Sequence, residues 1–151
     1  MRESLIRSSS AWSAAEMESF LRRTEIPVRL ACLSVSGAPL LCSVWYVYDD
    51  GVIWCATQRS ALLVKRLADD PRCAFEVAGD LPPYRGVRGQ GSAVLSPADG
   101  PEVLLRLIDR YLHRRDSEFA RWLIARQENE VAVRIEPDWL TSWDFSARMN
   151  R

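Results

Sequence analysis

The dipeptide Asp50-Gly51 separates two apolar runs, residues 44–48 and 52–56. A tight turn between two strands needs positive φ angles at its central residues, and Asp-Gly is a preferred pair for that conformation. The second run contains valine, isoleucine and tryptophan, which favour strands. The sequence therefore predicts a β-hairpin here, and with it an antiparallel sheet.

A short helix is expected directly after the hairpin, over residues 61–68. Ser60 is its expected N-cap, because a serine side chain can accept a hydrogen bond from the first helical turn. The helix must end before Asp70-Pro71, since the residue before a proline avoids helical backbone. The charges are unusual, because residues 52–67 contain three basic side chains and no acidic one.

This helix start is a candidate phosphate site. A helix N-terminus carries about half a positive charge and free backbone N–H groups, so it favours anions. Arg59 and Lys65 add charge, and Thr57 and Ser60 add hydroxyl groups, which together are typical of a phosphate site. Lys65 is the single lysine among 20 basic residues. Either a coding bias toward arginine or a functional need for an ammonium group explains this.

Length and composition indicate one soluble domain spanning residues 1–151. The chain is 48% hydrophobic and 26% charged, which is ordinary for a globular protein. Its 20 basic residues balance 20 acidic ones, so net charge gives no indication of nucleic-acid binding. No apolar run reaches the length of about 18 residues that would suggest a membrane span. The polar, serine-rich residues 1–12 are expected to be flexible or draped over the surface.

The cysteines and the single histidine limit the possible chemistry. Cys32, Cys42, Cys55 and Cys73 match no C-x-x-C or zinc spacing and lie in strand-like runs. We expect them to be reduced and buried, as suits a cytoplasmic protein. His113 is the only histidine, which argues against a multi-histidine metal site and against a Ser-His-Asp triad.

The order of the expected elements favours an antiparallel barrel. Three strands, a helix, two strands, two helices and a last strand do not alternate as parallel βαβ units would. Glycines inside the fifth strand indicate bends or bulges, which a small six-stranded barrel needs. Strands are expected at residues 28–35, 40–48, 52–60, 73–77, 85–95 and 131–135, the last ended by Pro137 and followed by an extended tail. Helices are expected at residues 14–23, from Ser96-Pro97, and from Asp116 or Ser117, the last with Phe119, Trp122 and Leu123 facing inward.

Four motifs in this order resemble the pyridoxamine 5'-phosphate oxidase-like, FMN-binding split β-barrel family. They are V-W-Y-V-Y-D-D-G (44–51), T-Q-R-S…K-R-L-A-D-D-P-R (57–72), Y-R-G-V-R-G-Q-G (84–91) and S-W-D-F (142–145). The resemblance spans roughly residues 26–145. It implies a mainly β (α+β) fold, a six-stranded antiparallel split barrel with flanking helices, and a homodimer with the cofactor at the subunit interface.

The resemblance also implies a set of cofactor-binding residues. The segment from Ser43 through Trp45 and Tyr46 would follow the flavin ring, largely through backbone groups. Gln90 would reach the cofactor from the partner subunit, and Trp143 would cover the edge of the ring. The family's phosphate-binding positions fall on Thr57, Arg59, Ser60 and Lys65, the site already derived from charge.

The implied function is an FMN-dependent oxidoreductase acting on an unknown small molecule. The Arg-x-His-type substrate signature of true pyridoxamine phosphate oxidases is missing near the C-terminus, which argues against pyridoxal-phosphate synthesis. One alternative is a deazaflavin-dependent reductase of the same fold, whose anionic coenzyme tail would suit Arg85 and Arg88. Another is a non-catalytic flavin- or heme-binding protein, in which His113 would be the obvious heme ligand.

Overall fold

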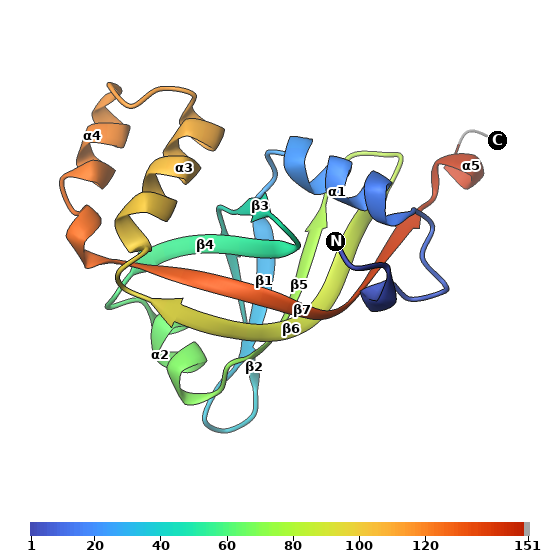
Figure 1. The fold of residues 1–151 in the computed structure, drawn as a ribbon, viewed down its shortest axis with the longest axis horizontal. Helices are drawn as coiled ribbons and strands as arrows, with labels where there is room; N and C mark the ends of the chain where they lie inside the picture. The colour runs from blue at the N-terminus through green and yellow to red at the C-terminus, as the bar shows by residue number, and fades with distance from the viewer. Residues whose placement is uncertain (150–151) are drawn as a thin grey trace.

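The computed structural model describes residues 1–149 and contains one seven-stranded antiparallel sheet, in the order β2-β1-β5-β6-β7-β4-β3 (Figure 1). The strands are β1 (Val28–Leu33), β2 (Pro39–Val44), β3 (Val47–Asp49), β4 (Val52–Gln58), β5 (Arg72–Ala78), β6 (Arg85–Ser96) and β7 (Glu130–Asp144). The helices are α1 (Ala14–Arg23), α2 (Leu62–Asp69), α3 (Gly100–Leu112), α4 (Glu118–Ile124) and α5 (Ser146–Met149), with 3-10 turns η1 (Glu3–Leu5) and η2 (Gln127–Asn129).

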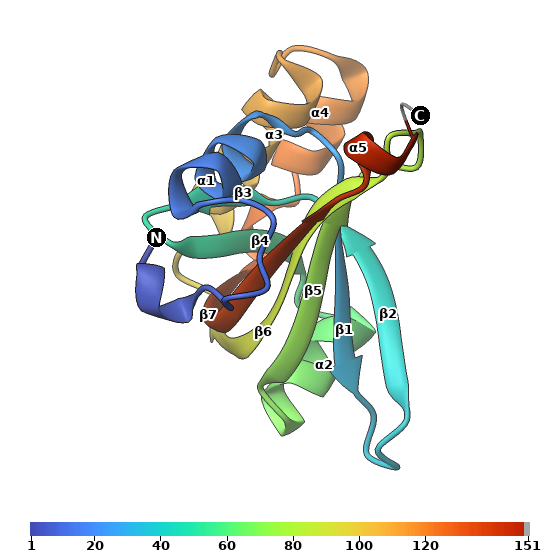
Figure 2. The same ribbon diagram turned by 90° about the vertical axis from the view of Figure 1, so that its right-hand side faces the viewer.

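The sheet is strongly curled, and its helices cover different parts of it. α2 packs against β1 and β6 at one end of the curl, and α1 packs against β3 (Figures 1 and 2). α3 lies against β4 and β7 and carries α4 on its far side. The edge strand β2 also comes into contact with β4, which lies at the other side of the sheet, so the curled sheet approaches closure. The expected split-barrel fold is therefore confirmed.

The sheet has seven strands instead of the expected six, because the predicted strand over residues 40–48 is two strands. β2 and β3 lie at opposite edges of the sheet, and Trp45 and Tyr46 form the crossing between them (Figure 2). The Asp50-Gly51 turn is confirmed: both residues have positive φ, 44° and 83°, and β3 pairs with β4 on either side of them.

The prediction that Pro137 ends the last strand is wrong. β7 continues to Asp144 and pairs with β6 from Ala132 to Asp144, on both sides of Pro137. A register shift between Gln90 and Gly91 sets Pro137 opposite Gly91, so the missing proline N–H falls at an irregular point of the ladder. A side chain at Gly91 would overlap the carbonyl oxygen of Glu136, so the close approach of the two strands requires glycine there.

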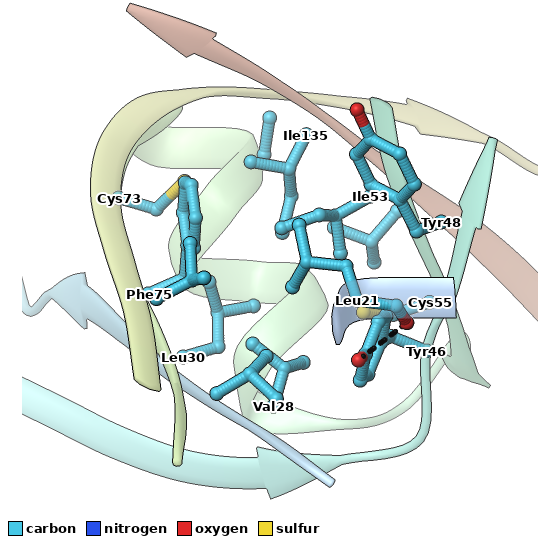
Figure 3. Close-up of a cluster of buried hydrophobic side chains, with 14 of the residues drawn as sticks. Leu21, Val28, Leu30, Tyr46, Tyr48, Ile53, Cys55, Cys73, Phe75 and Ile135 are labelled. Atoms are coloured by element: carbon cyan, nitrogen blue, oxygen red, sulfur yellow. Dashed lines mark hydrogen bonds between the residues drawn. The ribbon is translucent and has the colours of Figure 1, made fainter. Parts of the chain in front are cut away.

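The main core fills the inside of the curl (Figure 3). α1 begins with the predicted capping box between Ser13 and Glu16, and it buries Met17 and Leu21. Tyr46 enters this core from the β2–β3 crossing and donates a hydrogen bond of 2.8 Å to the carbonyl oxygen of Leu21. The crossing is thus tied to the end of α1.

The predictions for α3 and α4 need correction. α3 begins at Gly100 with Asp99 as N-cap, not at Ser96-Pro97, because residues 96–99 form a turn closed by a Ser96–Asp99 hydrogen bond. α4 has the predicted Ser117 cap, which accepts from the N–H of Ala120 at 3.1 Å. Phe119 and Trp122, however, do not face inward: about half of each side chain is exposed, and Ala120 is the residue that α4 buries.

Residues 1–12 run beside β7. Ile6 forms a parallel bridge to Leu140, and the Arg7 N–H donates to the Leu140 carbonyl at 2.9 Å. The side chains of Ser10 and Ser142 share a hydrogen bond of 2.8 Å. Within residues 1–149, no helix is both long and apolar enough to cross a membrane.

Candidate functional site

The candidate phosphate site is built on a tight turn between β4 and α2. The N–H of Ala61 donates to the carbonyl oxygen of Gln58 at 2.8 Å, which closes a four-residue turn. Arg59 and Ser60 are its two central residues, and both are exposed. The Arg59 N–H donates to the carbonyl oxygen of Asn129 at 2.8 Å, so the turn is also attached to η2.

Ser60 is not the N-cap of α2, and that prediction is wrong. The helix begins one residue later than expected, because the turn takes up Ser60, and Ala61 occupies the cap position. Alanine has no side-chain oxygen to accept from the first-turn N–H groups, which have no partner inside a helix either. The helix is held instead by Leu63 and Leu67, which are buried. Its N-terminal donors therefore remain suited to an external anion.

The charged groups of this site are available to a ligand. Arg59 and Lys65 are exposed, and among residues 1–149 their side chains form no ion pair or hydrogen bond with the protein. Thr57 is partly buried at the end of β4, opposite Val131 of β7. Backbone N–H groups, hydroxyls and two free cations form a donor set that fits a phosphate group.

Trp45 and Tyr46 have different roles in the β2–β3 crossing. The Trp45 ring is partly buried and stacks on Tyr111 of α3, with centroids 4.9 Å apart. Tyr46 is completely buried; its hydroxyl is bonded to α1, and its N–H donates to the Tyr111 hydroxyl at 3.3 Å. Burial and loss of hydration raise the pKa of Tyr46 well above its ordinary value. The side chain of Tyr46 is therefore part of the core and cannot contact a cofactor.

Gln90 and Trp143 lie on the outer face of the sheet, and within one chain they do not join the phosphate site. Gln90 accepts a hydrogen bond of 3.1 Å from the Trp139 indole N–H. The guanidinium of Arg88 lies over Trp143, 5.4 Å from the ring centroid. Ser43 shares this face, because strand pairing links Ser43, Arg29, Glu76, Arg88 and Thr141 in one row across five strands.

A basic and aromatic hollow of about 400 Å³ opens on the same outer face. Its walls include Arg7 and Arg88, each stacked over a tryptophan, and Arg7 is 4.0 Å from the ring centroid of Trp139. Sequence reasoning missed Arg7 and Trp139. The alternation of Trp139, Thr141 and Trp143 would have revealed Trp139 if the last strand had not been ended at Pro137, whereas no sequence pattern pointed to Arg7.

A buried carboxylate, Glu130, lies behind the turn on the side of α3. Glu130 is 4% exposed, and its carboxylate accepts a hydrogen bond from the side-chain amide of Gln58. Burial raises the pKa of Glu130, while the Gln58 hydrogen bond and the nearby Arg126 partly oppose that shift. Sequence reasoning gave no role to Gln58 or Glu130.

His113 is a surface residue. It ends α3 in the left-handed conformation, with φ 55°, and its Nε2 lies 3.2 Å from a Glu25 carboxylate oxygen. Its side chain is 66% exposed, so it does not face a cavity where a heme could be enclosed. Within the described chain, no group of three or more His, Cys, Asp or Glu side chains is placed to hold a metal ion.

The sequence matches no protein-family model and no curated protein. Solved structures do resemble the chain. A conserved hypothetical protein of Mycobacterium tuberculosis is 27% identical, with a TM-score of 0.78, over 96% of this chain and 92% of that one. A protein described as an F420 reductase is 22% identical, with a TM-score of 0.70, over 82% and 94% of the two chains. The heme storage protein HutZ of Vibrio cholerae is 13% identical, with a TM-score of 0.66, over 87% and 93%.

Proposed function

We propose that this chain, whose fold is that of the FMN-binding split β-barrels, binds FMN and serves as an oxidoreductase for a small molecule. The observation that carries the proposal is the turn at residues 58–61 with the start of α2. It offers an uncapped helix N-terminus and hydroxyl groups, together with cations that have no ion-pair partner among residues 1–149. A bound flavin supplies the hydride chemistry, while the protein supplies binding, orientation and electrostatics.

In this proposal the phosphate lies on the first-turn N–H groups of α2, with Thr57 and Ser60 as hydroxyl donors. Arg59 and Lys65 balance its negative charge. Ser43 and Trp45 border the ring, Ser43 through its backbone and Trp45 through its free edge. Tyr46 positions this segment through its bonds to α1 and Tyr111.

The proposal includes a homodimer that joins the outer faces of two sheets. The face is suited to contact because the small side chains of Ala31 and Ala74 line a shallow hollow of about 390 Å³, bordered by Leu41 and Trp139. Leu41 is 66% exposed in the single chain, which is unusual for a leucine on a sheet. Such a dimer would allow Gln90 and Trp143 to reach the cofactor of the partner. Light scattering at micromolar concentration tests this, and a monomer would remove both residues from the site.

A deazaflavin coenzyme is the second candidate. It is favoured by the hollow with Arg7 and Arg88, whose charges suit an anionic tail, and by the likeness to the F420 reductase. Arg85, the other arginine expected to serve such a tail, is exposed at the start of β6.

Parallel titrations separate the candidates. Purified apoprotein is titrated with FMN, riboflavin and coenzyme F420, and binding is followed by the change in flavin or deazaflavin fluorescence. We expect micromolar or tighter binding of FMN and weaker binding of riboflavin, which lacks the phosphate. Tighter binding of F420 would favour the second candidate, and binding of none of the three would refute the proposal. Reduction of the bound cofactor by a nicotinamide nucleotide then distinguishes an oxidoreductase from a protein that only stores flavin or heme.

A further inference from the structure

Gln58 is the first residue of the turn that presents Arg59 and Ser60. Its carbonyl oxygen closes the turn by accepting from the Ala61 N–H at 2.8 Å. Its side chain lies on the α3 side of β4 and donates a hydrogen bond to the carboxylate of Glu130. Gln58 therefore connects the turn to Glu130: its backbone closes the turn, and its side chain bonds to the carboxylate.

Glu130 is itself firmly placed. It is 4% exposed and begins β7, directly opposite Gln58 in the strand register. A side chain at Gly100 would overlap the Glu130 carbonyl oxygen, so the start of α3 packs directly on this residue. The positive charge of Arg126 partly opposes the rise in the pKa of Glu130. A carboxylate this deeply buried needs its hydrogen-bond partner, because an unpaired buried charge is costly.

The neighbouring residues repeat the attachment through the backbone. Asn129, just before Glu130, accepts from the Arg59 N–H at 2.8 Å. Two consecutive turn residues are thus bonded to two consecutive residues at the η2–β7 junction. Because a hydrogen bond to a charged group is stronger than one between neutral groups, the Gln58–Glu130 contact is the stronger of the two attachments.

We propose that Glu130 is a positioning residue for the cofactor phosphate: through Gln58 it holds the turn so that Arg59, Ser60 and the start of α2 address one anion. Glu130 does not touch the ligand in this proposal, because it is buried between Gln58 and the start of α3. The inference rests on the proposed function. A positioning role predicts that loss of Glu130 affects recognition of the phosphate and leaves recognition of the ring unchanged, whereas a purely structural role predicts that both are affected.

The test compares Glu130→Leu with Glu130→Gln, using FMN and riboflavin as ligands. Leucine fills similar space without an acceptor, whereas glutamine keeps an oxygen for the Gln58 amide. We expect Glu130→Leu to raise the Kd for FMN about tenfold, the size of one lost hydrogen bond, and to leave the Kd for riboflavin within about twofold. Glu130→Gln should remain within about threefold of the wild type for both ligands. Glu136→Leu, an exposed position on the same strand, is the matched control and should change neither.

Hydrogen exchange of the apoprotein provides a readout without ligand. Amides of residues 59–63 should exchange faster in Glu130→Leu than in the wild type, while α1 amides should not change. If Glu130→Leu does not fold, Gln58→Leu replaces it, with the same expected loss for FMN alone. Equal weakening of FMN and riboflavin, or no weakening of either, would overturn the positioning role. A wild type that binds riboflavin and FMN equally would refute the phosphate site itself, and with it this inference.

Discussion

The rings of Trp45 and Tyr111 are parallel to within 4°, with centroids 4.9 Å apart. This pair joins the β2–β3 crossing to α3, and the Tyr111 hydroxyl extends the connection by accepting from the Tyr46 N–H. Trp45 is therefore part of a small second core with Val103 and Leu107. Its role as packing residue and its proposed role beside the flavin ring can be separated by experiment.

Trp45→Ala should lower the free energy of unfolding by about 2–3 kcal/mol, because it removes a stacked, partly buried ring. Trp122→Ala is the matched control. Its ring also stacks, on Phe119, but is 51% exposed, so we expect a loss below about 1 kcal/mol. Urea unfolding followed by circular dichroism measures both. Equal losses would show that Trp45 contributes no more than a surface aromatic residue.

Lys65→Ala should weaken FMN binding more than Arg66→Ala. Lys65 lies on the exposed side of α2, about 200° around the helix from buried Leu63, whereas Arg66 is partly buried. We expect a loss of about 1.5–3 kcal/mol for Lys65→Ala, the range for a hydrogen bond to a charged group. Fluorescence titration with FMN gives both affinities. Equal affinities in the two variants would remove the reason for assigning Lys65 to the phosphate.

The four cysteines are free and should differ in their reaction with a thiol reagent. Burial raises the pKa of Cys73 to about 12 and that of Cys55 still further, so neither forms much thiolate near neutral pH. Cys42 is only partly buried and should react first. Timed labelling of the native protein followed by peptide mass analysis gives the order. Early labelling of Cys55 would contradict the buried placement.

Glu130 should make stability depend on pH. Its folded-state pKa is raised, mainly by burial, so the folded protein binds this proton more tightly than the unfolded chain. The resulting stabilisation is complete below the unfolded pKa and is lost as pH rises through the folded pKa. Relative to wild type, Glu130→Gln should therefore gain stability as pH rises from about 4 to 7. Urea midpoints of both proteins across this range test the sign, and parallel curves would contradict it.

Local signals predicted much of the fold. The Ser13–Glu16 capping box, the Asp50-Gly51 turn and the Ser117 cap each depend on residues close in sequence, and each is present. The misplaced end of the last strand came from a contact between distant residues. Pro137 is accommodated within β7 where Gly91, far away in the chain, offers an irregular point of pairing.

The site shows the same division. The candidate phosphate site follows from charge and from helix ends, which are local properties. The hydrogen bonds of Tyr46 depend on its contacts with α1 and α3, which are distant in the chain. The hydrogen bond between Gln58 and Glu130 depends on the β4–β7 register. Ser60 was misplaced by one residue because a serine suits a turn as well as a cap. How Gln90 and Trp143 serve the cofactor stays a prediction about the dimer.

Ala61 occupies the cap position of α2 and has no side-chain oxygen, so the first-turn N–H groups lack an acceptor from the protein side chain at that position. An anion bound there would accept the hydrogen bonds that a serine or aspartate cap accepts in other helices. Because such an anion would bind only the folded helix, binding and folding would be linked equilibria. At a cofactor concentration 100 times the Kd, this linkage stabilises the folded state by about 2.7 kcal/mol. The level of cofactor in the cell would then govern how long the protein survives as well as what it does.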